Sequence, residues 1–212
     1  MSAFGLVLAG GRSRRMGQDK ARLRLGGETL LGRTLARARR QVAGLVIVAG
    51  DRAGDRAGDR AENFADSGVP VLTDAIPGSA GPLAGLLAGL DHVAGERPDV
   101  SWLASFATDT PFFPPNLVAE LLAAASRQNV PIAMARSCGR VHPVFGLWHV
   151  SLRADLREAL VGEGIRKVDL WTARHGSALV NFPLSAGLDP FFNINTPDDL
   201  RRAATFLASD AG

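Results

Sequence analysis

A glycine-rich, basic segment follows the first apolar run of the chain. Residues 8–20 read Leu-Ala-Gly-Gly-Arg-Ser-Arg-Arg-Met-Gly-Gln-Asp-Lys. Gly10 and Gly11 let the main chain approach a ligand and turn its N–H groups onto phosphate oxygens. Arg15 and Lys20 are among the cations that could neutralise a polyphosphate. The spacing fits neither the Walker loop nor the dinucleotide-binding glycine fingerprint. The segment therefore predicts a phosphate-binding loop, with a plain basic surface loop as the alternative.

Two aspartates stand where later apolar runs end. Asp109 follows residues 102–107. It could hold Mg2+, which prefers oxygen ligands and often bridges to substrate phosphates, or it could cap the next helix. Asp74 precedes the Gly-Pro-Leu-Ala-Gly sequence of residues 81–85. Glycines at the start of a helix permit close packing under a nucleotide. Asp74 could accept hydrogen bonds from a ribose or base, or it could be an ordinary turn residue.

The second half of the chain offers further polar candidates. Asn193 and Asn195 are separated by one residue, so in a strand both amides would point the same way and could contact the edge of a heterocycle. The Thr-Pro pair that follows suits the start of a helix. His142 precedes a proline and could contact a phosphate or be structural. The four histidines lack zinc-site spacing. Cys138, the single cysteine, suits a small side chain near a turn better than a nucleophile.

The elements that must position these residues alternate along the chain. Buried strands are predicted at residues 4–9, 45–49, 69–73, 102–107, 131–135 and 144–150. Helices are predicted at residues 30–42, 83–93, 116–127, 152–160 and 197–208. This alternation is typical of an α/β fold with a doubly wound, mostly parallel sheet and helices on both faces. Ligands of such sheets bind outside the carboxyl ends of the strands, where the candidate residues fall.

Composition suits an ordinary globular protein. The chain has 212 residues, of which 46% are hydrophobic, and a formal net charge of +3. We expect a single domain over 1–212, in which about 1–115 bind a nucleotide and about 116–212 carry the second substrate. The sequence has neither an apolar run of about 20 residues nor a basic segment before its first apolar run. We therefore expect a cytoplasmic protein that binds no membrane. The early arginines flank a glycine loop without an aromatic platform, which argues against nucleic acid.

The glycine-rich segment also carries a resemblance. Its Leu-Ala-Gly-Gly-x-Ser-x-Arg-Met-Gly-x-Asp-Lys pattern resembles the signature of the sugar-nucleotide-type nucleotidyltransferases. The double glycine and the Met-Gly-x-Asp-Lys ending resemble in particular the molybdenum cofactor guanylyltransferases, the molybdopterin-guanine dinucleotide biosynthesis protein A family. The likeness extends to the Asp-Thr-Pro of residues 109–111, to residues 81–85 and to the Asn-x-Asn-Thr-Pro of residues 193–197. It spans about 5–203 and is thin between 118 and 182.

The resemblance implies a role for each candidate. The main chain of Leu8, Ala9 and Gly10 would contact the nucleotide. Gly11 and Arg15 would line the triphosphate, and Lys20 would offset charge as pyrophosphate leaves. Asp74 would belong to the nucleotide site, and Asp109 would hold Mg2+ as the cofactor ion. Asn193 and Asn195 would lie on the pterin side, where His142 is a further candidate to contact the pterin phosphate.

The implied reaction transfers GMP from GTP to the phosphate of molybdopterin and releases pyrophosphate. Further expected partners are other molybdenum-cofactor biosynthesis proteins and molybdoenzyme chaperones. The sequence departs from the family's pattern after the second strand, where residues 49–51 read Ala-Gly-Asp in place of the usual guanine-contacting asparagine. Asp51 could accept hydrogen bonds from guanine instead. The alternatives are a cytidylyltransferase or other nucleotidyltransferase of the same fold, and a non-catalytic GTP-binding protein that escorts the cofactor.

Overall fold

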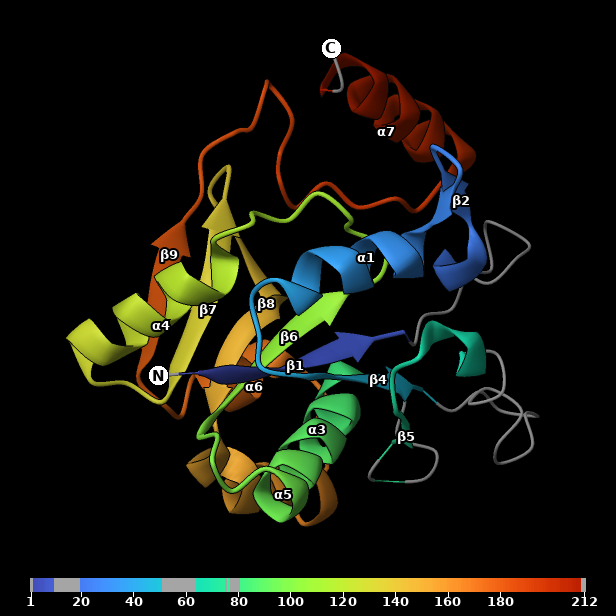
Figure 1. Ribbon diagram of the computed structural model, residues 1–212. Coiled ribbons are helices and arrows are strands. Elements are labelled where there is room, and N and C mark those ends of the chain that lie inside the picture. Colours follow the sequence, from blue (N-terminus) through green and yellow to red (C-terminus); the bar gives the residue numbers. More distant parts are fainter. Residues whose placement is uncertain (1, 10–19, 51–63, 75, 77–80, 211–212) are drawn as a thin grey trace.

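The computed structural model describes residues 2–9, 20–50, 64–74, 76 and 81–210. Within these residues, seven strands form one sheet in the order β5-β4-β1-β6-β8-β7-β9 (Figure 1). Their bounds are β1 Ala3–Leu8, β4 Leu45–Ala49, β5 Val71–Thr73, β6 Trp102–Ala107, β7 Ile132–Ser137, β8 Arg140–His149 and β9 Ser177–Asn181. β8 runs antiparallel to both its neighbours, whereas the other neighbouring strands pair in parallel. The prediction of a mostly parallel sheet is confirmed.

Helices cover both faces of the sheet. α1 Leu30–Arg39 and α4 Leu117–Gln128 pack on one face, and α3 Pro82–Glu96, α5 Arg153–Val161 and α6 Val168–Thr172 pack on the other (Figure 1). Each face has its own apolar core, centred on Phe106 and Phe113 on the α1 side and on Trp148 and Trp171 on the α3 side. The doubly wound prediction is therefore confirmed. Since strands from before and after residue 115 share this sheet, the division into 1–115 and 116–212 stays a prediction about function.

A third, smaller core joins a short hairpin near residue 25 to the C-terminal helix. The short strands β2 Arg24–Leu25 and β3 Glu28–Thr29 form a hairpin, and the C-terminal helix α7 Pro197–Asp210 packs beside it (Figure 1). Leu25, Leu30, Ile194 and Ala203 are buried together there. Ile194 has no exposed surface, so this core fixes the segment that leads into α7.

The sheet opens between β6 and β8 at one edge. β8 pairs with β6 only over residues 102–104, and its register against β7 shifts between Met134 and Ala135. Pro143 lies in the shifted stretch and cannot donate a ladder hydrogen bond. The buried Ser105 hydroxyl donates instead to Val144 O at 2.7 Å. Residues 105–107 of β6 are therefore not paired with β8 in the sheet.

Among the described residues, none of the helices combines the length and apolarity that crossing a bilayer requires.

Candidate active site at the carboxyl edge of the sheet

The parallel strands β1, β4, β5 and β6 end along one edge of the sheet. Leu8, the last residue of β1, is in register with both Val48 and Ala107, and the Ala9 N–H donates to Val48 O at 3.0 Å. The predicted main-chain contacts of Leu8 and Ala9 thus lie at the centre of this edge. It is the edge at which doubly wound sheets bind ligands.

The loop predicted to hold phosphates lies largely outside the described residues. Gly10, Gly11 and Arg15 fall there, as does Asp51. The structure describes the end of the segment, where Lys20 begins the 3-10 helix η1 Lys20–Arg22. η1 leads directly into the β2–β3 hairpin. The roles of these residues stay predictions.

Asp74 directly follows β5 and lies over the first turns of α3. A Cβ built on Gly85 would stand 3.6 Å from Asp74 Oδ1, 2.6 Å from Leu8 Cδ2 and 3.3 Å from Val48 Cγ1. The absence of a side chain at Gly85 therefore lets α3 approach the ends of β1 and β4. Asp74 thus lies close to Gly85 at the start of α3, and its contact with a nucleotide stays a prediction.

Asp109 is half-buried just beyond β6, and Asn193 lies against it. The Asn193 amide nitrogen donates to Asp109 Oδ1 at 2.7 Å, to Asp109 Oδ2 at 3.2 Å and to Thr110 Oγ1 at 2.8 Å. This orientation places donors against the carboxylate, whereas the reverse one would set the amide oxygen against two carboxylate oxygens. The Thr110 hydroxyl is 3.3 Å from Asp109 Oδ1, and the Ile194 N–H donates to Asp109 O at 2.8 Å. Side chain and main chain together hold Asp109 in place.

The expectation that Asn193 and Asn195 belong to a strand is wrong. The segment is not paired with the sheet. It is held in place by the burial of Ile194 and by a capping arrangement in which the Asn195 N–H donates to Asp199 Oδ2 at 3.0 Å. Both asparagines are nevertheless exposed on either side of the buried Ile194. Asn193 meets Asp109 in this arrangement, so its position is at the predicted metal carboxylate.

His142 lies in β8 at the same edge, beyond the opening next to β6. Its Nε2 is 2.8 Å from Ser137 Oγ, and its ring stacks on Phe191 with centroids 4.6 Å apart. Burial lowers the pKa of His142 below its ordinary value. The nearby Asp189 carboxylate opposes this effect and Arg140 adds to it. His142 is therefore neutral at neutral pH and is tied to the protein through one ring nitrogen.

Sequence reasoning missed four residues of this edge. Thr110 and Ser137 are almost fully buried polar side chains, and Asp189 accepts hydrogen bonds from the neighbouring segments. Phe191 packs in the apolar core on the α1 side of the sheet. Phe191 is 3% exposed, with ring centroids 5.0 Å from Phe145 and 5.7 Å from Phe182. The Asp-Pro-Phe-Phe sequence of residues 189–192, directly before the paired asparagines, was the available signal.

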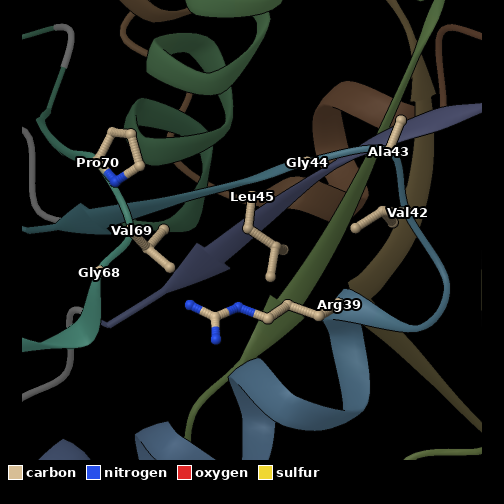
Figure 2. A pocket seen from close by; sticks show the side chains of 8 residues that line it. All are labelled: Arg39, Val42, Ala43, Gly44, Leu45, Gly68, Val69 and Pro70. Atoms are coloured by element: carbon tan, nitrogen blue, oxygen red, sulfur yellow. The ribbon is translucent and has the colours of Figure 1, made fainter.

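A surface cavity of about 280 Å³ lies at the opposite edge of the sheet (Figure 2). Arg39, Leu45, Val69 and Pro70 are among its lining residues. These residues precede or begin β4 and β5, so they stand at the amino ends of the strands. The Arg39 guanidinium donates to Ser67 O at 3.1 Å. The cavity is thus separate from the residues predicted to bind substrate.

The residues around Asp109 fit a hard divalent cation. No cluster of three or more His, Cys, Asp or Glu side chains occurs within the described part of the chain, so an all-protein cage is absent there. Mg2+ commonly uses one or two carboxylates and completes its shell with substrate phosphates and water. A half-buried carboxylate beside an amide that can turn its oxygen inward provides oxygen ligands of that kind.

Comparisons with known proteins show the family of the chain. Residues 5–176 match the family described as MobA-like NTP transferase domain. The chain is 44% identical to the molybdenum cofactor guanylyltransferase of Nitrobacter hamburgensis, covering 98% of this chain and 96% of the relative. It is 48% identical to that of a Bradyrhizobium species, over 97% and 93%. The solved molybdopterin-guanine dinucleotide biosynthesis protein A of Archaeoglobus fulgidus is 26% identical, with a TM-score of 0.75 over 97% of this chain and 99% of that one. The chain therefore belongs to the MobA-like NTP transferase family.

Proposed function

We propose that this protein transfers GMP from GTP to the terminal phosphate of molybdopterin and releases pyrophosphate. The observation that carries the proposal is the Asp109 carboxylate, fixed by Asn193 and Thr110 at the end of β6 in a chain that matches guanylyltransferases over nearly its full length. Such a carboxylate, placed beside the end of β1 from which the glycine-rich loop continues, suits a phosphoryl-transfer enzyme.

The proposed reaction is an in-line displacement. A phosphate oxygen of molybdopterin forms a bond to the α-phosphorus of GTP, and the bond from that phosphorus to the oxygen bridging to the β-phosphate breaks. Pyrophosphate leaves with both electrons of the broken bond. Catalysis of this kind depends on positioning and charge neutralisation rather than on a protein nucleophile.

The chain supplies positive charge and a fixed carboxylate for that reaction. Gly10 and Gly11 would direct main-chain N–H groups at the triphosphate, and Arg15 and Lys20 would neutralise charge on the leaving pyrophosphate. Asp109 would hold Mg2+, joined by the Asn193 amide oxygen once the amide turns over. When bound, the ion withdraws charge from the phosphate oxygens.

The acceptor would lie on the far side of Asp109 from β1. Asn195 is exposed, and His142 belongs to the neighbouring β8. Both are proposed contacts of molybdopterin. The main role proposed for Asn193 is to hold the Asp109 carboxylate. Other cofactor-biosynthesis proteins and molybdoenzyme chaperones are proposed to receive the product.

The test is pyrophosphate release from GTP, CTP, UTP and ATP with Mg2+ and molybdopterin. We expect release with GTP and none with Asp109→Ala. Release with CTP alone would contradict guanine selectivity, and Asp51→Asn would then show whether that position selects the base. Tight GTP binding without any release would contradict catalysis and favour the escort function.

A further inference from the structure

A buried hydrogen-bonded group lies beside the proposed site without forming part of it. Ser137, the last residue of β7, has no exposed surface. Its hydroxyl is 2.7 Å from Asp189 Oδ1 and 2.8 Å from His142 Nε2. Asp189 Oδ1 also accepts the Phe191 N–H at 2.9 Å, and Asp189 O accepts the Phe192 N–H at 2.9 Å. One carboxylate oxygen thus joins the end of β7 to the segment that follows β9.

The direction of these hydrogen bonds follows from the chemistry of the three groups. A carboxylate only accepts, so the Ser137 hydroxyl donates its single hydrogen to Asp189. His142 must then donate its Nε2–H to Ser137 Oγ. This order, from His142 through Ser137 to Asp189, is the reverse of what activates a serine, because the imidazole takes no proton from the hydroxyl. The group is therefore a support and not a nucleophilic centre.

The segment held by Asp189 reaches Asp109 within a few residues. Phe191, whose N–H donates to Asp189, packs its ring in the core on the α1 side of the sheet, where it contacts Phe145 and stacks on His142. Asn193 then donates to the Asp109 carboxylate, and the Ile194 N–H donates to Asp109 O. If residues 189–192 shifted, the Asn193 amide would move with them.

We propose that Asp189 is a positioning residue that sets the place of Asn193, and through it the Asp109 carboxylate, by tying residues 189–192 to Ser137 at the end of β7. The proposal rests on the proposed function, because Asp109 matters to the reaction only if the chain is a nucleotidyltransferase. Removing a residue that orients a metal-binding side chain commonly lowers metal affinity or activity.

The test is a double-mutant cycle between Asp189 and Asn193. Asp189→Ala should lower kcat for pyrophosphate release by about 10- to 100-fold and raise the half-saturating Mg2+ concentration, because the carboxylate loses its fixed position. The KM for GTP should stay within about twofold. Asp189→Asn should recover most of the activity, since its amide oxygen can still accept from Ser137 and Phe191. Asp99→Ala, which removes an exposed aspartate paired with Arg97, is the matched control.

The loss of kcat in the double variant, compared with the losses in the two single variants, decides the proposal. If Asp189 acts through Asn193, adding Asp189→Ala to Asn193→Ala should cause little further loss. If the two losses multiply, Asp189 acts independently and the proposal is wrong. A readout without turnover is hydrogen exchange of the Ile194 amide in the free protein, which Asp189→Ala should accelerate by about tenfold or more. Unchanged exchange would also overturn the proposal.

Two further outcomes are separable. If the wild-type protein releases no pyrophosphate, the proposed function fails, and the exchange measurement alone still tests the tie between Asp189 and Ile194. If Asp189→Ala does not fold, Ser137→Ala removes one of the two hydrogen bonds at Asp189 Oδ1. It should show the same changes to a smaller degree, and wild-type exchange and kcat in that variant would contradict the proposal.

Discussion

The amide nitrogen of Asn193 lies 2.7 Å from Oδ1 of Asp109, although the two residues are far apart in the chain. Asp109 lies just beyond the central strand β6, and Asn193 precedes the last helix. The contact forms because Ile194, next to Asn193, is buried in the core that joins α7 to the β2–β3 hairpin. A residue expected to contact the pterin is thereby placed on the carboxylate expected to hold the metal.

Asn193→Ala should therefore impair catalysis more than binding of the acceptor. We expect kcat to fall by about 10- to 100-fold and the half-saturating Mg2+ concentration to rise, with the KM for molybdopterin nearly unchanged. Steady-state pyrophosphate release across a Mg2+ series measures both quantities. Asn116→Ala, at the exposed start of α4, is the control. A rise in the acceptor KM with kcat preserved would instead assign Asn193 to the pterin.

Lys20→Ala should remove most turnover without loss of fold. The lysine ends the predicted phosphate-binding segment, and loss of one cation aimed at developing charge commonly costs about 10²- to 10³-fold in kcat. Arg40→Ala removes the same charge at the exposed end of α1, near the opposite edge of the sheet, and should leave kcat unchanged. Pyrophosphate release and circular dichroism of both variants provide the comparison. Equal activity of Lys20→Ala and wild type would remove Lys20 from the mechanism.

The sequence predicted the inner strands of the sheet more closely than its edge strand β9 and the β2–β3 hairpin. β4 and β6 have the predicted bounds, because both are continuous apolar runs buried on two faces. β9 was not predicted, because this edge strand of Ser-Ala-Leu-Val-Asn is partly exposed and carries no continuous apolar signal. The β2–β3 hairpin was not predicted either. Its turn residues Gly26 and Gly27 both have positive φ, which suits a two-residue turn between antiparallel strands.

Some residues of the candidate site could likewise be predicted from the sequence, and others could not. Asp109 and Asp74 could be predicted because strand ends and glycine turns are local features of the sequence. The contact of Asn193 with Asp109 could not, since it depends on how the last helix docks. Ser137 lies in a part of the chain without a recognisable motif, and the Asp-Pro-Phe-Phe sequence that begins at Asp189 does not indicate a partner on β7. The fold alone brings the two side chains together.

Gly85→Ala should disturb the nucleotide side of the site. A methyl group would stand 2.6 Å from Leu8 Cδ2 and 3.3 Å from Val48 Cγ1, so α3 or Leu8 must move. Overpacking of this kind costs about 1–3 kcal/mol, against a gain of about 1 kcal/mol from alanine in a helix. We expect lower stability in urea and a higher KM for GTP.

Gly95→Ala on the same helix separates the two effects. A Cβ on Gly95 would meet no atom within 4 Å, so this variant should gain stability by up to about 1 kcal/mol, with an unchanged KM for GTP. If both glycine variants behaved alike, close packing at Gly85 would not be what places Leu8 and Asp74.

Asp199→Ala should destabilise the protein in a way that disappears in acid. Burial alone would raise the pKa of Asp199, but hydrogen bonds from the Thr196 hydroxyl and from the N–H groups of Asn195 and Thr196 outweigh it, so the pKa lies below its ordinary value of 3.8. A carboxyl whose pKa is lowered by folding stabilises the native state above its unfolded pKa. That contribution is lost as the pH falls through its folded pKa.

The measurement is urea unfolding of wild type and Asp199→Ala from about pH 7 to about pH 3. Loss of the reciprocal cap between Thr196 and Asp199 should cost about 1 kcal/mol near neutral pH, and the difference between the two proteins should shrink towards the acid end. Asp198→Ala, next in the chain but exposed and paired only with Arg201 across one helical turn, should cost less than about 0.5 kcal/mol. A difference for Asp199→Ala that stayed constant with pH would mean that the ionised carboxylate is not what holds the start of α7.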